Sequence, residues 1–561
     1  MVIYIRKYHC RDFVNLIRKK CFFLIFLLIF FFDPGLLRGQ DPYNYFYRIY
    51  FRDKGNSSIT DFAPGDLLSD KAIKRREKSG IPVLQISDIP VSSEYIENVK
   101  SLGLNFHCAS KWMNTALFKS PAIYNTNDLL SLPFVADVKL VKNPAPKSLF
   151  KDKLHVTVIS TDPLPFERPV TQLNGHTLHN SGFTGIGILI AVLDGGFLYA
   201  DKASSLTGLN NRKGIKATYD FVNNKTMVYD NHTHGTSVLS VLAGKEEGVI
   251  AGTAPGADFL LFRTEDANSE FPVEEDFWAA AAEFADSAGA DIISSSLGYS
   301  HFDNPAMNYK YEDLDGSTVF ITRVAEAAAS KGIMVFNSAG NERNNPWIHI
   351  IAPADGENVV AVGSVDLNNV ISSFSSAGPS ADGRIKPDNT AMGGSIPVQV
   401  NLSTVAASSG TSFSCPVLSG MTACLLQAIP MATNTEIMGV LHSSGHKSID
   451  PDSLYGYGTP DMKKAIASLH EIHIIIPENE AVLNPNPTTG SLEIIFRDPP
   501  ETLIIELFSI LGKSLFRKSY PGQTGRTIRF DELQGKKQGL YIIRLTTGNG
   551  TFARKVIKLN N

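Results

Sequence analysis

The most constraining feature of this chain is an apolar run that ends in a carboxylate. Residues 188–193 read Ile-Leu-Ile-Ala-Val-Leu and lead directly into Asp194, Gly195 and Gly196. An uninterrupted apolar run of this length is typical of a strand buried on both faces of a parallel sheet, and the glycines let the chain turn away sharply. Because ligands bind at the carboxyl ends of such strands, Asp194 is a candidate site residue. The alternative is an aspartate that only caps a strand.

Apolar strands alternate with helical stretches over residues 175–470, for example at 279–288 and 323–331. This alternation predicts an α/β domain with a mostly parallel sheet flanked by helices on both faces. At 561 residues the chain is too long for one hydrophobic core, so we expect three or four domains.

Two further blocks supply the remaining groups of a nucleophilic site. His234 opens the stretch His-Gly-Thr-Ser, and Ser412 lies in the block Ser-Gly-Thr-Ser-Phe-Ser-Cys-Pro at 409–416. A serine hydroxyl becomes a good nucleophile when an imidazole accepts its proton, and a carboxylate at the other ring nitrogen fixes the imidazole tautomer. Ser412 is predicted at a helix start, with Pro416 in the first turn, where a missing amide hydrogen is tolerated. A serine that only caps a buried helix is the alternative.

The order Asp, His, Ser along the chain, in these local settings, resembles the subtilase family of serine endopeptidases. The resemblance spans about residues 175–467. It implies that Asp194, His234 and Ser412 are the catalytic residues of an exported endopeptidase, which hydrolyses peptide bonds of proteins through an acyl-enzyme on Ser412. Protein or peptide substrates are then its partners, and the chemistry requires no cofactor.

The same resemblance assigns residues around the substrate. Asn341, at the end of the run 332–341, is expected to donate its side-chain amide to the oxyanion together with the backbone amide of Ser412. Alternatively, this Ala-Gly-Asn turn is purely structural, because Asn and Gly suit left-handed backbone. Ser296, Leu297 and Gly298 are expected to line the main specificity pocket.

Two other classes of function are alternatives to an endopeptidase. One is a surface protein that keeps the fold for binding but has lost catalysis; the presence of all four chemical residues in their settings argues against it. The other is a serine hydrolase that acts on esters. The Asp-His-Ser order disfavours the α/β-hydrolase version of that idea.

The amino-terminal segment 1–39 has the pattern of a secretory signal peptide. Basic residues precede an apolar run at 21–32, which is short for a membrane-spanning helix and typical of a signal core. An uncleaved anchor is the alternative.

Two of the five cysteines would leave with this segment. Cys415 and Cys424 are nine residues apart on one predicted helix, which puts them about 180° apart, so they cannot bridge each other.

Residues 41–145 read as a small α+β domain, with strand-like runs at 47–51 and 134–141 and a helix at 92–100. The pattern resembles the propeptide that precedes many subtilases, which implies that the enzyme's own propeptide acts as an inhibitor. The polar, proline-bearing residues 146–174 then form a processing linker. A permanent amino-terminal domain is the alternative.

Residues 476–561 predict a small β-sandwich. Strands are expected at 492–496, 503–508, 527–530, 540–545 and 552–559, with a hairpin signal at Gly548-Asn549-Gly550.

The Asn-Pro-Asn-Pro-Thr opening of this segment at 484–488, Gly-Leu-Tyr at 539–541 and Lys-Val-Ile-Lys at 555–558 resemble the type IX secretion sorting domain. The resemblance implies a Gram-negative bacterium, type IX export machinery as a partner, and delivery through the periplasm to the outside or to the outer-membrane surface. A β-sandwich that binds substrate or carbohydrate is the alternative.

Composition excludes some functions. A formal net charge of −4 gives no indication of nucleic-acid binding. No Cys/His cluster has zinc-ligand spacing, and no compact oxygen-ligand motif is present. No metal ligand is therefore assigned, although the resemblance to subtilases, in which calcium sites are frequent, allows structural calcium.

Overall fold

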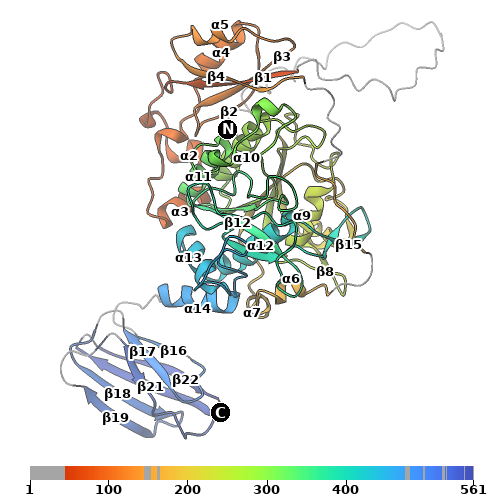
Figure 1. Ribbon diagram of the computed structural model, residues 1–561. Helices are drawn as coiled ribbons and strands as arrows, with labels where there is room; N and C mark the ends of the chain where they lie inside the picture. The colour runs from red at the N-terminus through yellow and green to blue at the C-terminus, as the bar shows by residue number, and fades with distance from the viewer. Residues whose placement is uncertain are drawn as a thin grey trace, which may run out of the picture. The chain divides into compact units, whose positions relative to one another are not determined.

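The computed structural model describes residues 44–144, 153–160, 165–473, 481–484, 486–496, 499–520, 525, 527–548 and 550–559. The chain divides into two compact units, Met1–Leu469 and His470–Asn561 (Figure 1). The expected signal peptide lies outside the described residues. Within the described part of the chain, no helix combines the length and apolarity needed to cross a bilayer.

A seven-stranded parallel sheet forms the centre of the first unit, in the order β13-β12-β11-β10-β5-β9-β6. This confirms the predicted α/β architecture. Its strands are β5 (Leu189–Asp194), β6 (Ile215–Asp220), β9 (Asp258–Arg263), β10 (Ile292–Ser295), β11 (Met334–Ser338), β12 (Val359–Val365) and β13 (Asn389–Met392). The helices beside it include α9 (His234–Ala243), α10 (Val273–Ala288), α11 (Phe320–Ser330), α12 (Thr411–Ala428), α13 (Asn434–Ser444) and α14 (Met462–Ile472).

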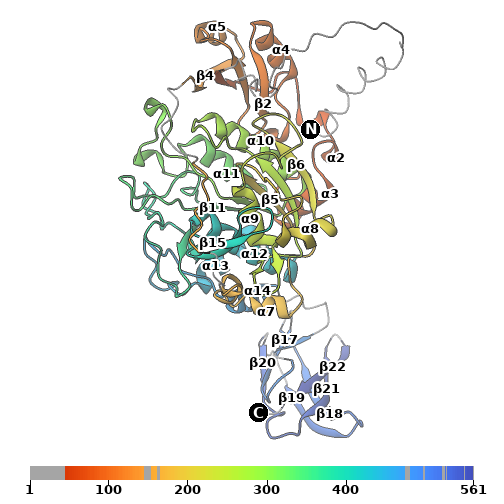
Figure 2. The ribbon, with the colours of Figure 1, turned by 90° about the vertical axis from the view of Figure 1, so that its right-hand side faces the viewer.

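The pleat of β5 decides where its last side chain points. Leu189 and Leu193 pack in a core with α10 and α11, whereas Ile190 and Val192 pack in a second core with α9 and α12. Figure 2 shows these two pairs of helices on opposite sides of β5. Since successive side chains of a strand alternate between faces, Asp194 points to the side of Val192, toward α9 and α12.

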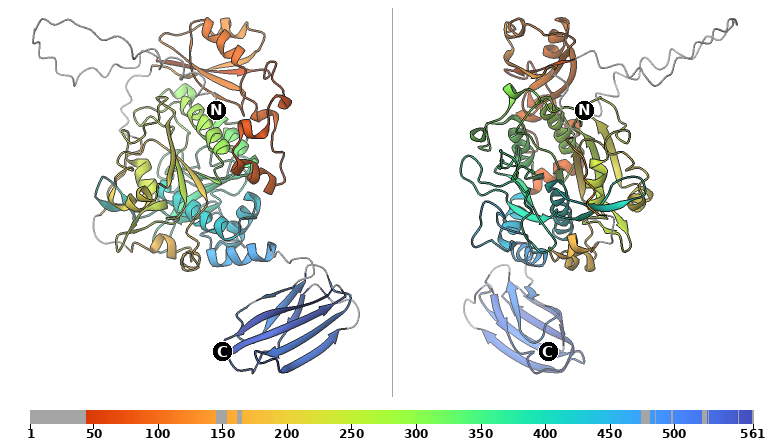
Figure 3. Two further views of the ribbon diagram at one scale, coloured as in Figure 1. Left: turned by 180° about the vertical axis from the view of Figure 1, so that it is seen from behind. Right: turned by 45° about the vertical axis from the view of Figure 1, so that its right-hand side comes forward.

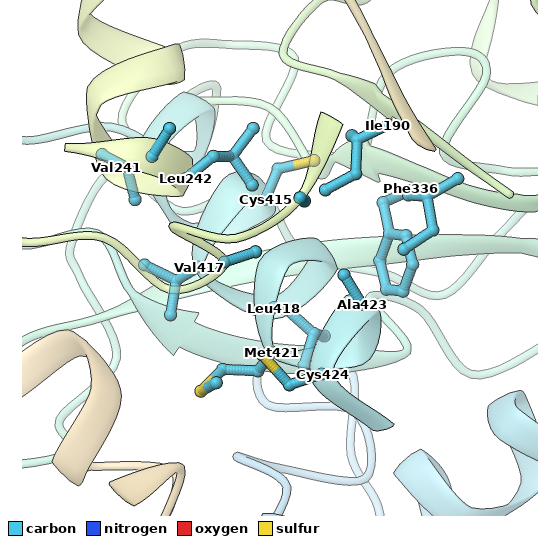
Figure 4. Close-up of a cluster of buried hydrophobic side chains, with 14 of the residues drawn as sticks. Ile190, Val241, Leu242, Phe336, Cys415, Val417, Leu418, Met421, Ala423 and Cys424 are labelled. Carbon is cyan, nitrogen blue, oxygen red and sulfur yellow. The ribbon is translucent and has the colours of Figure 1, made fainter. Parts of the chain in front are cut away.

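Helix α12 packs with its apolar residues against the central sheet. Cys415 and Leu418 lie in one buried cluster with Ile190 of β5 and Phe336 of β11 (Figure 4). Cys415 and Cys424 are both free thiols, as their spacing predicted. Burial raises the pKa of Cys415 to about 12, so this thiol stays protonated and behaves as a core side chain.

Pro416 lies inside α12, five residues after the helix begins at Thr411, which corrects the prediction that it lies in the first turn. An amide at this position would donate to the carbonyl of Ser412, one turn earlier. That carbonyl instead accepts a hydrogen bond of 2.8 Å from the hydroxyl of Ser296. The end of β10 therefore supplies the donor that proline lacks.

The N-terminal domain, residues 44–144, contains a four-stranded antiparallel sheet in the order β2-β3-β1-β4. The predicted α+β character is confirmed, and the expected strands and helix correspond to β1, β4 and α4. The elements are β1 (Tyr45–Phe51), α2 (Pro64–Leu67), α3 (Asp70–Lys78), α4 (Ser93–Ser101), β2 (Asn105–Ser110), β3 (Thr115–Ser120), α5 (Thr126–Leu130) and β4 (Val135–Lys142).

Buried ion pairs join this domain to α10. Nη2 of Arg48, on β1, lies 2.8 Å from Oδ2 of Asp276. On α3, Nη2 of Arg76 lies 2.6 Å from Oδ2 of Asp286, and Arg75 pairs with the same carboxylate. All five side chains are buried. Buried charges of this kind are tolerated only while each retains its partner, so the pairs fix how the domain sits on α10.

The second unit consists of two antiparallel sheets that enclose one apolar cluster, which confirms the predicted β-sandwich (Figure 3). The five expected strands are present, and Thr547 pairs with Gly550 across the expected hairpin; Asn549 lies outside the described residues. Two strands, β16 and β19, were not predicted. The sheets contain β16 (Ala481–Asn484), β17 (Leu492–Phe496) and β20 (Thr527–Phe530), and β18 (Leu503–Ser509), β19 (Ser514–Tyr520), β21 (Gly539–Thr547) and β22 (Gly550–Lys558).

We expect Asp286→Asn to destabilise the first unit strongly, because it leaves the buried guanidinium of Arg75 without a carboxylate and leaves Arg76 with Asp88 alone. The free energy of unfolding should fall by about 3–5 kcal/mol. Urea unfolding followed by tryptophan fluorescence measures it, since all three tryptophans lie in the first unit. The control is Glu77→Gln, an exposed carboxylate on the same helix as the arginines. Equal effects of the two substitutions would contradict the assigned role of the ion pairs.

Candidate functional site

Asp194 and His234 form a buried hydrogen-bonded pair. Nδ1 of His234 lies 2.8 Å from Oδ1 and 3.0 Å from Oδ2 of Asp194, and the backbone amide of Gly195 donates to Oδ1 at 2.7 Å. An ionised carboxylate only accepts, so Nδ1 carries the proton of this bond. The other ring nitrogen, Nε2, is then an acceptor in the neutral imidazole, which is the tautomer that a general base requires.

Glycines allow the start of α9 to approach the end of β5 this closely. The amide of Gly235 donates to the carbonyl of Gly196 at 3.0 Å. A Cβ on Gly235 would lie 2.5 Å from that carbonyl oxygen, and a Cβ on Gly196 would lie 2.8 Å from the backbone nitrogen of His232. Any side chain at either position would push the imidazole away from the carboxylate.

His232 has a positioning role that sequence reasoning missed. Its Nδ1 accepts the backbone amide of His234 at 3.0 Å, at the first residue of α9. The first amides of a helix have no partner within the helix, so His232 supplies one. The signal in the sequence is a polar side chain just before a small-residue helix.

Ser412 is the second residue of α12 and lies in the same cleft as His234. Its hydroxyl donates to the carbonyl of Ser296 at 3.4 Å, a long bond that leaves the hydroxyl able to rotate. A cavity of about 760 Å³ is lined by Ser412, His234, Asn341 and residues 296–298. The structure therefore brings together all the residues that the sequence singled out, at the carboxyl ends of β5, β10 and β11 and the starts of α9 and α12.

Asn341 is held with its amide nitrogen available. Its Oδ1 accepts from the backbone amide and from the hydroxyl of Thr411, both at 3.0 Å. Within the described ranges, neither Nδ2 of Asn341 nor the backbone amide of Ser412 has an acceptor. A Cβ on Gly410 would lie 3.8 Å from the Ser412 nitrogen and 3.9 Å from Asn341 Nδ2, so glycine keeps the space between the two donors open. Two such donors can stabilise an oxyanion.

Residues 153–160, which we call the cleft segment, run along this cavity. Residues 153–156 line it together with His234 and Ser412. Farther along, the amide of Ile159 donates to the carbonyl of Ala407, and the amide of Ala407 donates to the carbonyl of Ser160, both at 2.8 Å. The segment thus pairs with β15 (Val405–Ser408) as an extended peptide. Sequence reasoning placed it in a linker and gave no indication of this position.

Three glutamates, which we call the acidic cluster, surround the first side chain of the cleft segment. The ammonium nitrogen of Lys153 lies 2.7 Å from Glu265, 2.8 Å from Glu270 and 2.8 Å from Glu274. Among the described residues, this is the one group of three carboxylates close enough together to hold a metal ion. Here the cation at its centre is the lysine.

The acidic cluster and Lys153 perturb one another. Burial raises the pKa of Glu270 to about 7, although the ammonium of Lys153 acts in the opposite direction. Burial and the neighbouring Glu265 raise the pKa of Glu274 well above its ordinary value. Burial alone would lower the pKa of Lys153, but the carboxylates outweigh it and raise that pKa well above the ordinary value. The lysine is therefore charged, and the cluster depends on it.

Comparison with known proteins assigns each part of the chain. A model of the subtilase family matches residues 185–458, and a model of the peptidase S8 propeptide domain of Bacteroidota matches residues 46–155. A model of a secretion system C-terminal sorting domain matches residues 482–559.

Individual relatives agree. Subtilisin E of Bacillus subtilis is 29% identical over 316 residues, which cover 55% of this chain and 73% of that protein. Subtilisin of Bacillus pumilus is 30% identical over 301 residues, covering 53% and 97%. Serine protease AprX of Bacillus subtilis is 30% identical over 327 residues, covering 52% and 68%.

The fold is that of an α/β enzyme whose cleft opens at the carboxyl ends of parallel strands. With the matches above, the chain belongs to the subtilase family and is a serine endopeptidase, preceded by a propeptide domain and followed by a secretion sorting domain. The sorting domain makes it a secreted or cell-surface protein. The resemblances seen in the sequence are thereby confirmed.

Replacing Lys153 by Met should destabilise the chain in a pH-dependent way. Without the ammonium, the folded state holds protons on the acidic cluster that the unfolded state releases, so stability falls as the pH rises. We expect the loss to be small below pH 4.5 and to grow up to and beyond about pH 7, the pKa that Glu270 has beside Lys153. Melting temperatures measured from pH 4 to pH 8 provide the test, in a chain that also carries Ser412→Ala to remove the predicted nucleophile.

The matched control is Lys464→Met, which removes an exposed lysine of α14. It should leave the melting curve unchanged at every pH. A Lys153→Met deficit that is independent of pH would contradict the electrostatic coupling.

Proposed function

We propose that this protein hydrolyses peptide bonds of protein substrates through an acyl-enzyme on Ser412. The observation that carries the proposal is the Asp194–His234 hydrogen bond, which holds the imidazole in the tautomer that a general base requires. His234 and Ser412 line the same cavity. Ser412 Oγ attacks the substrate carbonyl carbon while Nε2 of His234 accepts its proton. The imidazolium returns that proton to the leaving amine as the C–N bond breaks. Water then hydrolyses the ester by the same route.

We assign the oxyanion site to Nδ2 of Asn341 and the backbone amide of Ser412. Support comes from their geometry: Thr411 holds the amide oxygen of Asn341, which leaves the nitrogen as the donor, and Gly410 leaves the neighbouring space open. Ser412 also lies in the first turn of α12, where the helix dipole favours negative charge. Donors fixed before the reaction stabilise developing charge without reorganisation.

We assign substrate binding to Ser296, Leu297 and Gly298. They follow β10 and line the cavity. A Cβ on Gly298 would lie 2.5 Å from Cγ1 of Ile351, so a side chain at this position would require Ile351 to move. An extended substrate could pair with their backbone, which gives affinity that does not depend on side chains. The chemistry needs no cofactor, and structural calcium stays unassigned.

We propose the following division of the chain: signal peptide 1–39, inhibitory propeptide 41–145, processing linker 146–174, catalytic domain 175–470 and sorting domain 476–561. Support for inhibition comes from the cleft segment, the part of the linker that follows the propeptide and lies in the cavity that a substrate would enter. Support for export comes from the sorting-domain match. We propose that type IX machinery delivers the enzyme through the periplasm to the outside or the outer-membrane surface of a Gram-negative bacterium.

Two assays separate this function from its rivals. A fluorophosphonate probe should label Ser412, whereas a non-catalytic binding protein would not be labelled. Casein should be cleaved by the parent and not by Ser412→Ala, which an esterase would not show. Mass spectrometry of both ends of the exported protein checks the division of the chain.

Asn341→Ala should lower kcat about 100- to 1,000-fold with little change in KM, because the lost donor acts on the transition state. Steady-state hydrolysis of a peptide substrate measures both constants. Asn368→Ala, at an exposed asparagine, is the control and should behave as the parent does. A kcat for Asn341→Ala equal to that of the control would contradict the oxyanion assignment.

A further inference from the structure

We propose that the acidic cluster is a substrate subsite that binds a lysine or arginine side chain, and that Lys153 occupies it before the chain is processed. The inference rests on the proposed endopeptidase function and adds to it a substrate class: proteins with a basic residue at the position that Lys153 holds. Glu265, Glu270 and Glu274 are then specificity-determining residues.

The cluster is built into the fold rather than gathered on the surface. The side chains of Glu265 and Glu274 are 2% and 1% exposed, and those of Lys153 and Glu270 are 19% and 22% exposed. One edge of the cluster therefore opens toward the cleft.

Hydrogen bonds fix the two buried carboxylates. Tyr299 donates its hydroxyl to Glu265, and the backbone amide of Asp266 donates to Glu274 at 2.7 Å. Tyr299 bonds to the oxygen of Glu265 that does not face the lysine. Oε1 of Glu274 accepts both from Asp266 and from the ammonium of Lys153. The donors therefore fix both carboxylates in place around the cation. Preformed partners of this kind give selectivity through charge.

The cleft segment lies as an extended substrate would lie. The hydroxyl of Ser408 donates to the carbonyl of Thr157 at 2.8 Å, and the pairing with β15 follows. Before this point, a Cβ on Gly195 would lie 2.0 Å from Cδ1 of Leu154, so Leu154 rests against the residue that follows Asp194. The segment thus passes from the acidic cluster, along the cavity that holds Ser412, to the edge of β15.

Peptides that bind by strand pairing gain affinity from the backbone and specificity from side-chain pockets. In the cleft segment, the pocket filled by a charged side chain is the acidic cluster. When the segment leaves, the three carboxyl groups lose the ammonium that paired their charges. A basic side chain of a substrate restores the contacts of Lys153, whereas a neutral one leaves the carboxylates unpaired.

The test uses enzyme recovered after export of the full chain. Its substrates are quenched peptides with the sequence of residues 152–162, Asp-Lys-Leu-His-Val-Thr-Val-Ile-Ser-Thr-Asp, carrying Lys, Arg, Met or Glu at the second position. At pH 8 we expect the Lys and Arg peptides to exceed the Met peptide in kcat/KM by about 30-fold or more, with the Glu peptide lower still.

Variants of the enzyme link the preference to the cluster. Glu270→Gln should reduce the ratio of Lys to Met several-fold, whereas Glu246→Gln, an exposed glutamate of β7 (Lys245–Glu246), should leave it unchanged. Equal kcat/KM for the Lys and Met peptides would overturn the proposal. So would stoichiometric binding of Ca²⁺, abolished by Glu270→Gln, in an enzyme without preference for the Lys peptide, because the cluster would then be a metal site.

Failure of the subsite and failure of the enzyme are distinguishable. If casein is cleaved and Ser412 is labelled by a fluorophosphonate, but the peptides do not differ, only the subsite is wrong. If neither casein nor any peptide is cleaved and Ser412 is not labelled, the proposed function fails, and the subsite fails with it.

Discussion

A carboxylate buried at the end of a parallel strand is the constraint on which this structure depends. The side chain of Asp194 has no access to solvent, so its charge requires donors inside the protein. The amide of Gly195 and Nδ1 of His234 supply them. The pleat of β5 aims the carboxylate at α9, and glycines at 196 and 235 allow the approach. The same bond that satisfies the buried charge also orients the imidazole toward the cleft.

Paired charges also attach the N-terminal domain and the cleft segment. Arginines of β1 and α3 reach the carboxylates of α10, and Lys153 reaches the acidic cluster. An interface built from charges is specific when both sides are present, and its halves can be solvated when they separate. This suits the role proposed for the cleft segment, which occupies the cavity until the chain is processed. The acidic cluster is then left with a preference for the kind of charge it has lost.

The sequence predicted the elements whose signal is local. The strand ending at Asp194 was recognisable because no polar residue interrupts it. His234 and Ser412 were recognisable because each lies in a short, characteristic block of sequence. Pro416 was misplaced because the donor that compensates for it, Ser296, lies far away in the chain. Strand β19 was missed because it lies at the edge of its sheet and its residues are mostly exposed, so no apolar alternation marks it. The acidic cluster was invisible because Lys153 and the glutamates meet only through the fold.

The central claim is that Asp194, His234 and Ser412 act as one unit. The most direct measurement compares kcat/KM for peptide hydrolysis by Ser412→Ala, by His234→Ala and by the double variant. If the hydroxyl and the imidazole share one step, the three variants will have about the same residual activity, because removing either group already removes the function of both. If the double variant instead loses the product of the two single effects, the groups act independently and the account is contradicted.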